Sequence, residues 1–206
     1  MRARAAIHHL CAVLAVLASA AVQGECECLW QGSFSDVQAA TNLVVSGVVS
    51  KGKGNAIDLA VKRLLRGEED HQTIRVWLKT GDLCRPEAEH FPVGSQWLMA
   101  LHRINDAVAG GFNPHTPNIS YGRVGDYSLS SCGGYWLAQN EEWVSGNLVQ
   151  APRWAREPEM TPVLIDLVAD FVAGKVDAQT LLAASKQDPA VRELMLDTRS
   201  FLREQE

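Results

Sequence analysis

The stretch Cys26-Glu27-Cys28 stands directly after an apolar N-terminal segment and far ahead of the next two cysteines, Cys84 and Cys132. A ring closed between Cys26 and Cys28 is too small for ordinary disulfide geometry, so each is expected to bond to one of the distant cysteines. Two pairings satisfy this condition. Either one ties the start of the mature chain to two separate places, and a terminus that would otherwise fray becomes a rigid surface feature.

Residues 1–24 have the features of a secretory signal peptide. Two arginines supply the positive start, Leu10–Ala18 is an apolar run of signal-core length, and small residues provide cleavage sites after Ala20 or Gly24. The apolar run is too short to span a bilayer. We therefore expect a secreted protein, extracellular or periplasmic, that has no membrane attachment after signal cleavage. Its four remaining cysteines are expected to form disulfides in an oxidising compartment.

The charge balance argues against a nucleic-acid partner. The chain has a formal net charge of −5, and it becomes more acidic when the two arginines of the signal are removed. It contains no cluster of basic residues interleaved with aromatic ones. The length that remains suits one domain, or one domain with an appendage.

Alternating apolar and polar residues predict strands in residues 43–50, 57–65 and 73–79. A turn is expected in residues 51–55 and a hairpin loop in residues 67–70. A helix through residues 57–65 is the alternative there. In the third strand Trp77 is an apolar exception on the outer face.

The next apolar run, residues 96–102, is nearly continuous, which is typical of a strand buried on both faces. Residues 106–125 are rich in Gly, Asn and Pro and predict an insertion, and residues 127–132 predict the last strand. A short helical turn is expected around residues 35–40. Five short strands with irregular loops favour a mainly β fold with a small closed barrel.

The period becomes helical after residue 150. Pro152–Pro162 is expected to be a linker, with Thr161 as the cap and Pro162 as the first residue of a helix that ends at Gly174. Asp177 is expected to cap a second helix, and a third is expected after Asp188. The predicted organisation is therefore a signal peptide (1–24), a barrel (25–150), and a linker with C-terminal helices (151–206).

Other side-chain patterns offer weaker indications. His71, His90, His102 and His115 lack metal-ligand spacing, and no catalytic constellation has local support, so neither a cofactor nor an enzyme is expected. The acidic runs Glu68–Asp70 and Glu141–Glu142 are interpreted as solvated faces, with an acidic contact patch as the alternative. Four aromatic residues are expected to pack the helices on the barrel, or alternatively to form a platform for a partner: Tyr135, Trp136, Trp143 and Trp154. Asn118 begins a glycosylation sequon by spacing alone.

Four stretches together resemble the netrin-like module, the five-stranded OB-fold barrel of the tissue inhibitors of metalloproteinases. They are the Cys26-x-Cys28 pair after a signal peptide, Thr80–Cys84 (TGDLC), Gly94–Met99 (GSQWLM) and Leu129–Gly133 (LSSCG). The resemblance covers residues 26–145. It implies an OB-fold-like closed barrel and the disulfides Cys26–Cys84 and Cys28–Cys132.

The resemblance also implies a function. In that family the α-amino group and carbonyl of the first cysteine chelate the catalytic zinc of a protease, and the next side chain enters its main specificity pocket. This implies a secreted protein-binding module that inhibits an extracytoplasmic zinc metalloprotease. Cys26 would be a backbone ligand to the partner's zinc only if it is the mature N-terminus. The implied contact residues are Cys26, Glu27, Cys28, Gly81, Asp82 and Leu83.

A non-inhibitory interaction module with purely structural disulfides is the alternative. Cleavage after Gly24 leaves Glu25 ahead of Cys26 and removes the free amine. Glu27 places a charge where the family tends to have a small residue, and the chain lacks cysteines for the family's third disulfide. A third hypothesis is thiol–disulfide exchange, because adjacent thiols can exchange disulfides.

Overall fold

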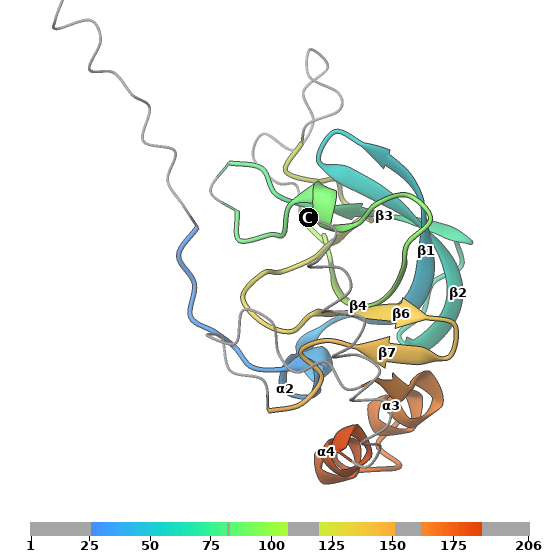
Figure 1. The fold of residues 1–206 in the computed structure, drawn as a ribbon. Helices are drawn as coiled ribbons and strands as arrows, with labels where there is room; N and C mark the ends of the chain where they lie inside the picture. The colour runs from blue at the N-terminus through green and yellow to red at the C-terminus, as the bar shows by residue number, and fades with distance from the viewer. Residues whose placement is uncertain (1–25, 82, 107–119, 151–161, 187–206) are drawn as a thin grey trace, which may run out of the picture.

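The computed structural model describes residues 26–81, 83–106, 120–150 and 162–186. The predicted signal peptide, most of the linker, the third C-terminal helix, Asp82, His115, Asn118 and Trp154 lie outside these residues. The described elements, drawn in Figure 1, are α2 (Phe34–Val37), η1 (Gln38–Ala40), β1 (Leu43–Lys53), β2 (Ala56–Arg66), β3 (Thr73–Trp77), η2 (Ala88–His90), β4 (Gln96–Arg103), β5 (Tyr127–Ser128), β6 (Trp136–Asn140), β7 (Trp143–Ser145), β8 (Val163–Leu164), α3 (Ile165–Val172) and α4 (Ala178–Lys186).

Five strands close into a barrel. Strand β1 pairs antiparallel with β2, β2 antiparallel with β3, β3 parallel with β5, β5 antiparallel with β4, and β4 antiparallel with β1. The register shifts three times along the β1–β2 pair, and such irregularities bend a strand. Strand β1 can therefore pair with β2 along one edge and β4 along the other. The predicted mainly β fold with an OB-fold-like closed barrel is confirmed.

The barrel interior is filled by the apolar faces that the alternation predicts. Leu43, Val45 and Val49 of β1 are buried, as are Ile74 and Val76 of β3. Four consecutive residues of β4, Leu98 to Leu101, are fully buried, which confirms a strand covered on both faces. Strand β2 is a strand along its whole length, so the helical alternative for residues 57–65 is wrong.

Some of the predicted strands differ from the observed ones. Strand β1 continues to Lys53, so the turn is shorter than residues 51–55. The last barrel strand, β5, contains only Tyr127–Ser128, because residues 129–132 leave the barrel toward the disulfides. Residues 136–140, for which no strand is predicted, form β6, which pairs with the first half of β4.

Strands β7 and β8 extend this sheet beyond the barrel. Strand β8 pairs with β7 at Trp143↔Leu164 and Val144↔Val163. This pairing overrides the predicted helix start at Pro162, and α3 begins only at Ile165. The helix ends where Gly174 adopts a positive φ of 73°, as predicted.

Both described C-terminal helices pack on the barrel (Figure 1). Val168 of α3 and Leu181 of α4 are fully buried and belong to the same hydrophobic core as the strands. Arg63 of β2 donates to Asp166 of α3 at 2.5 Å, and Asp177 accepts from the backbone of Thr180 at 2.9 Å, as a helix cap does. None of the helices in the described ranges has the length and apolar character needed to cross a membrane.

A second, smaller apolar cluster lies outside the barrel. Trp77 is on the outer face, as the alternation predicts, yet it is only 1% exposed and packs with Ala56 and Ile104. Residues 120–126 cover it: a Cβ on Gly122 would stand 3.5 Å from the Trp77 ring and 2.4 Å from Ile104. The tryptophan Nε1 donates to Asp126 at 2.7 Å, so both its apolar body and its polar edge are satisfied.

Candidate functional site

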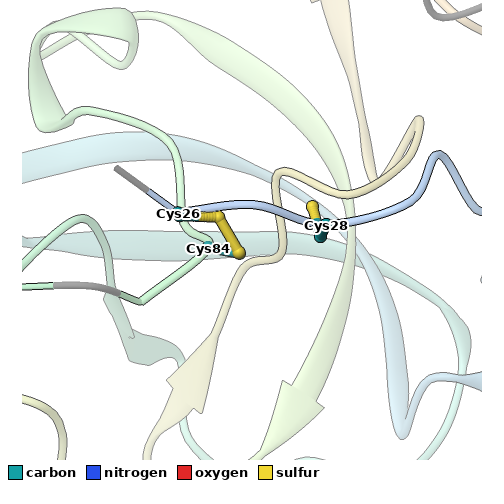
Figure 2. A group of neighbouring side chains, drawn as sticks. All are labelled: Cys26, Cys28 and Cys84. Atoms are coloured by element: carbon teal, nitrogen blue, oxygen red, sulfur yellow. A yellow bond between two sulfur atoms is a disulfide. The ribbon is translucent and has the colours of Figure 1, made fainter. Parts of the chain in front are cut away.

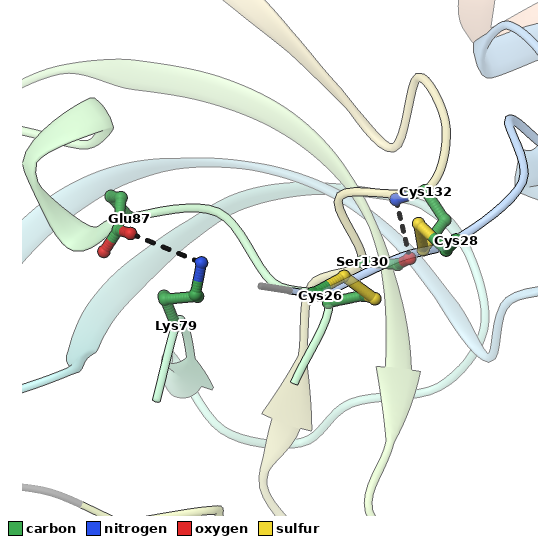
Figure 3. Close-up of a disulfide and its surroundings, with 7 residues drawn as sticks. Cys26, Cys28, Lys79, Glu87, Ser130 and Cys132 are labelled. Carbon is green, nitrogen blue, oxygen red and sulfur yellow. Dashed lines mark hydrogen bonds and ion pairs between the residues drawn. A yellow bond between two sulfur atoms is a disulfide. The ribbon is translucent and has the colours of Figure 1, made fainter. Parts of the chain in front are cut away.

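Two disulfides attach the start of the described chain to the barrel. Cys26 bonds to Cys84, with Cα atoms 5.1 Å apart, and Cys28 bonds to Cys132, with Cα atoms 5.8 Å apart (Figures 2 and 3). This is the pairing that the netrin-like resemblance implies. Residues 26–28 are therefore attached to two loops, one after β3 and one after β5. Two such bonds indicate a compartment outside the reducing cytoplasm.

The two loops that receive the disulfides are themselves joined. The amide of Ser131 donates to the carbonyl oxygen of Cys84 at 3.0 Å, and the amide of Cys132 donates to Ser130 Oγ at 3.1 Å (Figure 3). Lys79 and Glu87, which precede and follow Cys84 in the chain, form an ion pair of 3.6 Å (Figure 3). The two loops that hold Cys26 and Cys28 are therefore connected to each other by a backbone hydrogen bond.

Backbone hydrogen bonds continue the attachment beyond Cys28. Gln31 donates its amide to the carbonyl of Cys132 at 2.7 Å, and Gly134 donates to Gly32 at 2.9 Å. Phe34 then begins α2 and is fully buried. We call residues 26–31 the clamped segment, because two disulfides and these hydrogen bonds hold it extended along the surface.

Side chains alternate along the clamped segment. Cys26, Cys28 and Trp30 are partly buried, whereas Glu27, Leu29 and Gln31 are exposed. Leu29 is 87% exposed, the highest value among the exposed large hydrophobic side chains of the described residues. The clamped segment therefore turns its disulfides toward the protein and presents a row of side chains to solvent.

The other predicted contact residues lie in the loop that contains Cys84. Gly81 is exposed, Leu83 is partly buried, and Asp82 lies outside the described residues. Gly81 has a φ of +55°, and a Cβ there would stand 2.6 Å from the hydroxyl of Tyr121, so this loop conformation requires glycine. The Cys26–Cys84 disulfide holds this loop next to Cys26, as a contact surface made of both segments requires.

Three sulfur atoms gather at the anchor. Those of Cys26, Cys28 and Cys84 lie within 4.8 Å of one another (Figure 2). All three are in disulfides, and the ligand for a metal is a thiolate, so in this form the cluster is a pair of adjacent bridges. In the described part of the chain no histidine belongs to a metal-ligand cluster. The ring of His102 contacts that of Tyr135 in a tilted arrangement, with ring centroids 5.5 Å apart, and burial lowers the pKa of His102.

A hollow of about 330 Å³ on the outer face of β2, β3 and β5 is a second polar site. Glu69, predicted to be solvated, lies in its wall with its side chain only 4% exposed. It accepts from the Tyr127 hydroxyl at 2.6 Å and from the backbone amide of His71 at 2.8 Å. Its neighbours Glu68 and Asp70 are exposed, as predicted. The interpretation failed at Glu69 because a run of acidic residues does not reveal which one meets a donor from another strand.

The contacts of Glu69 make the free energy of unfolding depend on pH in the acidic range. Burial by itself raises the pKa of Glu69, but hydrogen bonds from Tyr127 and His71 and the charge of His71 outweigh it and lower the pKa from 4.5 to about 2. Since the folded pKa lies below the unfolded one, the stabilisation is present above pH 4.5 and is lost as pH falls toward 2. We expect a loss of about 2–3 kcal/mol in that window.

Unfolding by urea at a series of pH values from 2 to 7 measures this loss. Glu69→Gln should be less stable at pH 7 and should lack this part of the pH dependence. The exposed neighbour provides the control, because Glu68→Gln should follow the wild-type curve. Equal curves for the two variants would show that Glu69 is not the group responsible.

Comparisons with protein-family models, characterised proteins and solved structures gave no match to this chain. The candidate site therefore rests on its own geometry: a clamped segment whose disulfides face inward and whose alternate side chains face solvent.

Proposed function

We propose that the chain is a secreted protein-binding module that presents the clamped segment to another protein. The observation that supports this is the double attachment of an extended, exposed segment: disulfides at two residues only two positions apart, with solvent-facing side chains around them.

The physical advantage of such a segment is preorganisation. A free terminus loses conformational entropy when a partner orders it, and this loss subtracts from the binding free energy. In the clamped segment the disulfides have already removed most of that freedom. The exposed side chains therefore bind at a lower entropic cost than the same sequence in a free tail.

The sharper form of the proposal follows the netrin-like resemblance and makes the partner a zinc metalloprotease. The amine and carbonyl of Cys26 would occupy the open position of the partner's zinc, and Glu27, Cys28 and the loop with Gly81, Asp82 and Leu83 would line the contact. The amine is free only if export leaves Cys26 as the first residue. The same proposal makes the chain a binding protein and not an enzyme.

The experiment compares two mature proteins, one that begins at Cys26 and one that retains Glu25. Each is titrated against thermolysin and against the catalytic domain of a metzincin, with a quenched fluorogenic peptide as substrate. The protein that begins at Cys26 is expected to inhibit at least tenfold more strongly, because an amide nitrogen is a far poorer zinc ligand than an amine. Absence of inhibition by both proteins would refute protease inhibition.

A non-inhibitory interaction module is the second candidate, and the exposed carboxylate of Glu27 favours it, because burying a charge in an apolar specificity pocket is costly. It predicts equal binding by the two mature proteins. Thiol–disulfide exchange predicts free thiols at Cys26 and Cys28, which a thiol titration of the exported protein would detect. The pairing of both residues with distant cysteines supports a structural role.

A further inference from the structure

We infer that Leu29 is the anchor of the interaction, and that it enters an apolar pocket of the partner protein whose rim carries a positive charge opposite Glu27. This inference rests on the proposed function, and it differs from the family resemblance in one respect. The resemblance places the side chain after the first cysteine, Glu27, in the main pocket. The geometry of the clamped segment points to the residue two positions further on.

The exposure of Leu29 is the first argument. Burying a leucine side chain is favourable in proportion to the apolar area removed from water, and 87% of this one is still available. Isolated exposed leucines are ordinary on protein surfaces. This one differs because its neighbours Cys28 and Trp30 are turned toward the protein, and Cys28 is fixed by a disulfide. A large, exposed apolar side chain on a rigidly held backbone is the arrangement of an interface anchor.

The neighbouring exposed positions do not compete for this role. Gln31 uses its side-chain oxygen to accept from the Tyr135 hydroxyl, and its amide donates to Cys132, so it serves the fold. Glu27 is free to face a partner, but an apolar pocket would have to bury its charge without a partner ion. Leu29 is therefore the apolar contact and Glu27 the charged one.

The charges near the clamped segment define the rim of the partner's pocket. Glu27 is exposed, and Glu87 is 56% exposed while its ion-pair partner Lys79 is 33% exposed. Because Glu87 is paired with Lys79, the charge that residues 26–31 themselves present to a partner is the carboxylate of Glu27. A partner with basic residues around an apolar pocket complements this pattern, whereas an anionic membrane surface would be repelled.

The test uses the mature protein that begins at Cys26, with the zinc endopeptidases named above as probes. Leu29→Ala is expected to weaken inhibition about 10- to 100-fold, and Leu29→Asp more strongly still. Glu27→Gln is expected to change inhibition less than Leu29→Ala does and to reduce its dependence on salt. The matched control is Leu64→Asp: Leu64 is 38% exposed on β2, which lies across the barrel from the clamped segment in Figure 1, and inhibition should stay within about threefold.

The outcomes separate the two proposals. Inhibition by the wild type that is unchanged in both Leu29 variants, or that depends on Glu27 more than on Leu29, overturns the anchor and leaves the proposed function standing. A wild type that inhibits neither protease overturns protease inhibition, and with it the anchor that is inferred for that contact. Sedimentation that shows a wild-type dimer lost in Leu29→Asp also overturns the inference, because a second copy would then be the occupant. Intact mass of each variant verifies that both disulfides are formed.

Discussion

Replacing Cys28 and Cys132 together by alanine is expected to lower the free energy of unfolding by about 4–5 kcal/mol. The bond joins residues separated by 104 positions, and a cross-link over so long a loop strongly restricts the unfolded chain. The folded barrel keeps its core in the variant, because neither cysteine belongs to the cluster of buried residues that fills it. Chemical denaturation monitored by tryptophan fluorescence measures the difference.

The second disulfide provides the comparison. Cys26→Ala with Cys84→Ala opens a loop of separation 58, and the same entropy argument gives about 4 kcal/mol. The two losses should not add when all four cysteines are replaced, because the two loops share most of their residues. A loss below about 1 kcal/mol for Cys28 and Cys132 would show that the bridge does not restrict the unfolded state and serves only to hold the clamped segment.

Trp77→Ala is expected to cost about 3–5 kcal/mol, although Trp77 lies outside the barrel. The substitution empties the small cluster that Trp77 forms with Ala56 and Ile104 and leaves Asp126 without the Nε1 donor. Two guanidinium groups, those of Arg75 and Arg123, also lie 5.9 Å from the ring centroid. Because residues 120–126 cover this cluster, their amides should exchange hydrogen faster in the variant.

One further substitution separates the lost apolar volume of Trp77 from its lost hydrogen bond, and a second serves as a control at an exposed tryptophan. Trp77→Phe keeps most of the apolar contact and loses the donor, and about 1–2 kcal/mol is expected. Trp143→Ala removes an exposed tryptophan of β7 and should cost less than about 1 kcal/mol. Equal losses for Trp77→Ala and Trp143→Ala would contradict the assignment of Trp77 to a buried cluster.

Periodicity predicted the barrel well where strands are long. Strands β1 to β4 each bury an apolar set that recurs along several residues, and such a pattern is visible without partners. Strand β5 has only two paired residues, and β6 to β8 are short and mixed in character. Strand β6 forms because the edge of β4 offers backbone hydrogen bonds, and β7 and β8 each form on the edge of the strand before them. A local sequence pattern does not show that such an edge is available.

The same limit applies to the polar residues of the barrel wall. Asn55 was expected only in a turn, yet its side chain donates to the carbonyl of Ser120 at 2.8 Å and accepts from the amide of Ser120 at 2.9 Å. This contact fixes the segment that covers Trp77. The two residues are far apart in the chain, so neither the sequence near Asn55 nor that near Ser120 indicates their pairing.

By itself the sequence determined that the chain has alternating apolar strands, a helical tail with caps at Asp177 and Gly174, and a Cys-x-Cys pair whose members must bond to distant cysteines. The strands and the capped helices depend on neighbouring residues. The pairing with distant cysteines follows because a disulfide between Cys26 and Cys28 would close too small a ring. Only the tertiary structure decided how the barrel closes, that Glu69 and Trp77 are buried, and that Leu29 is the exposed apolar residue of the clamped segment. Each of these depends on which distant segments meet, because burial is a property of the assembled surface and not of the local chain.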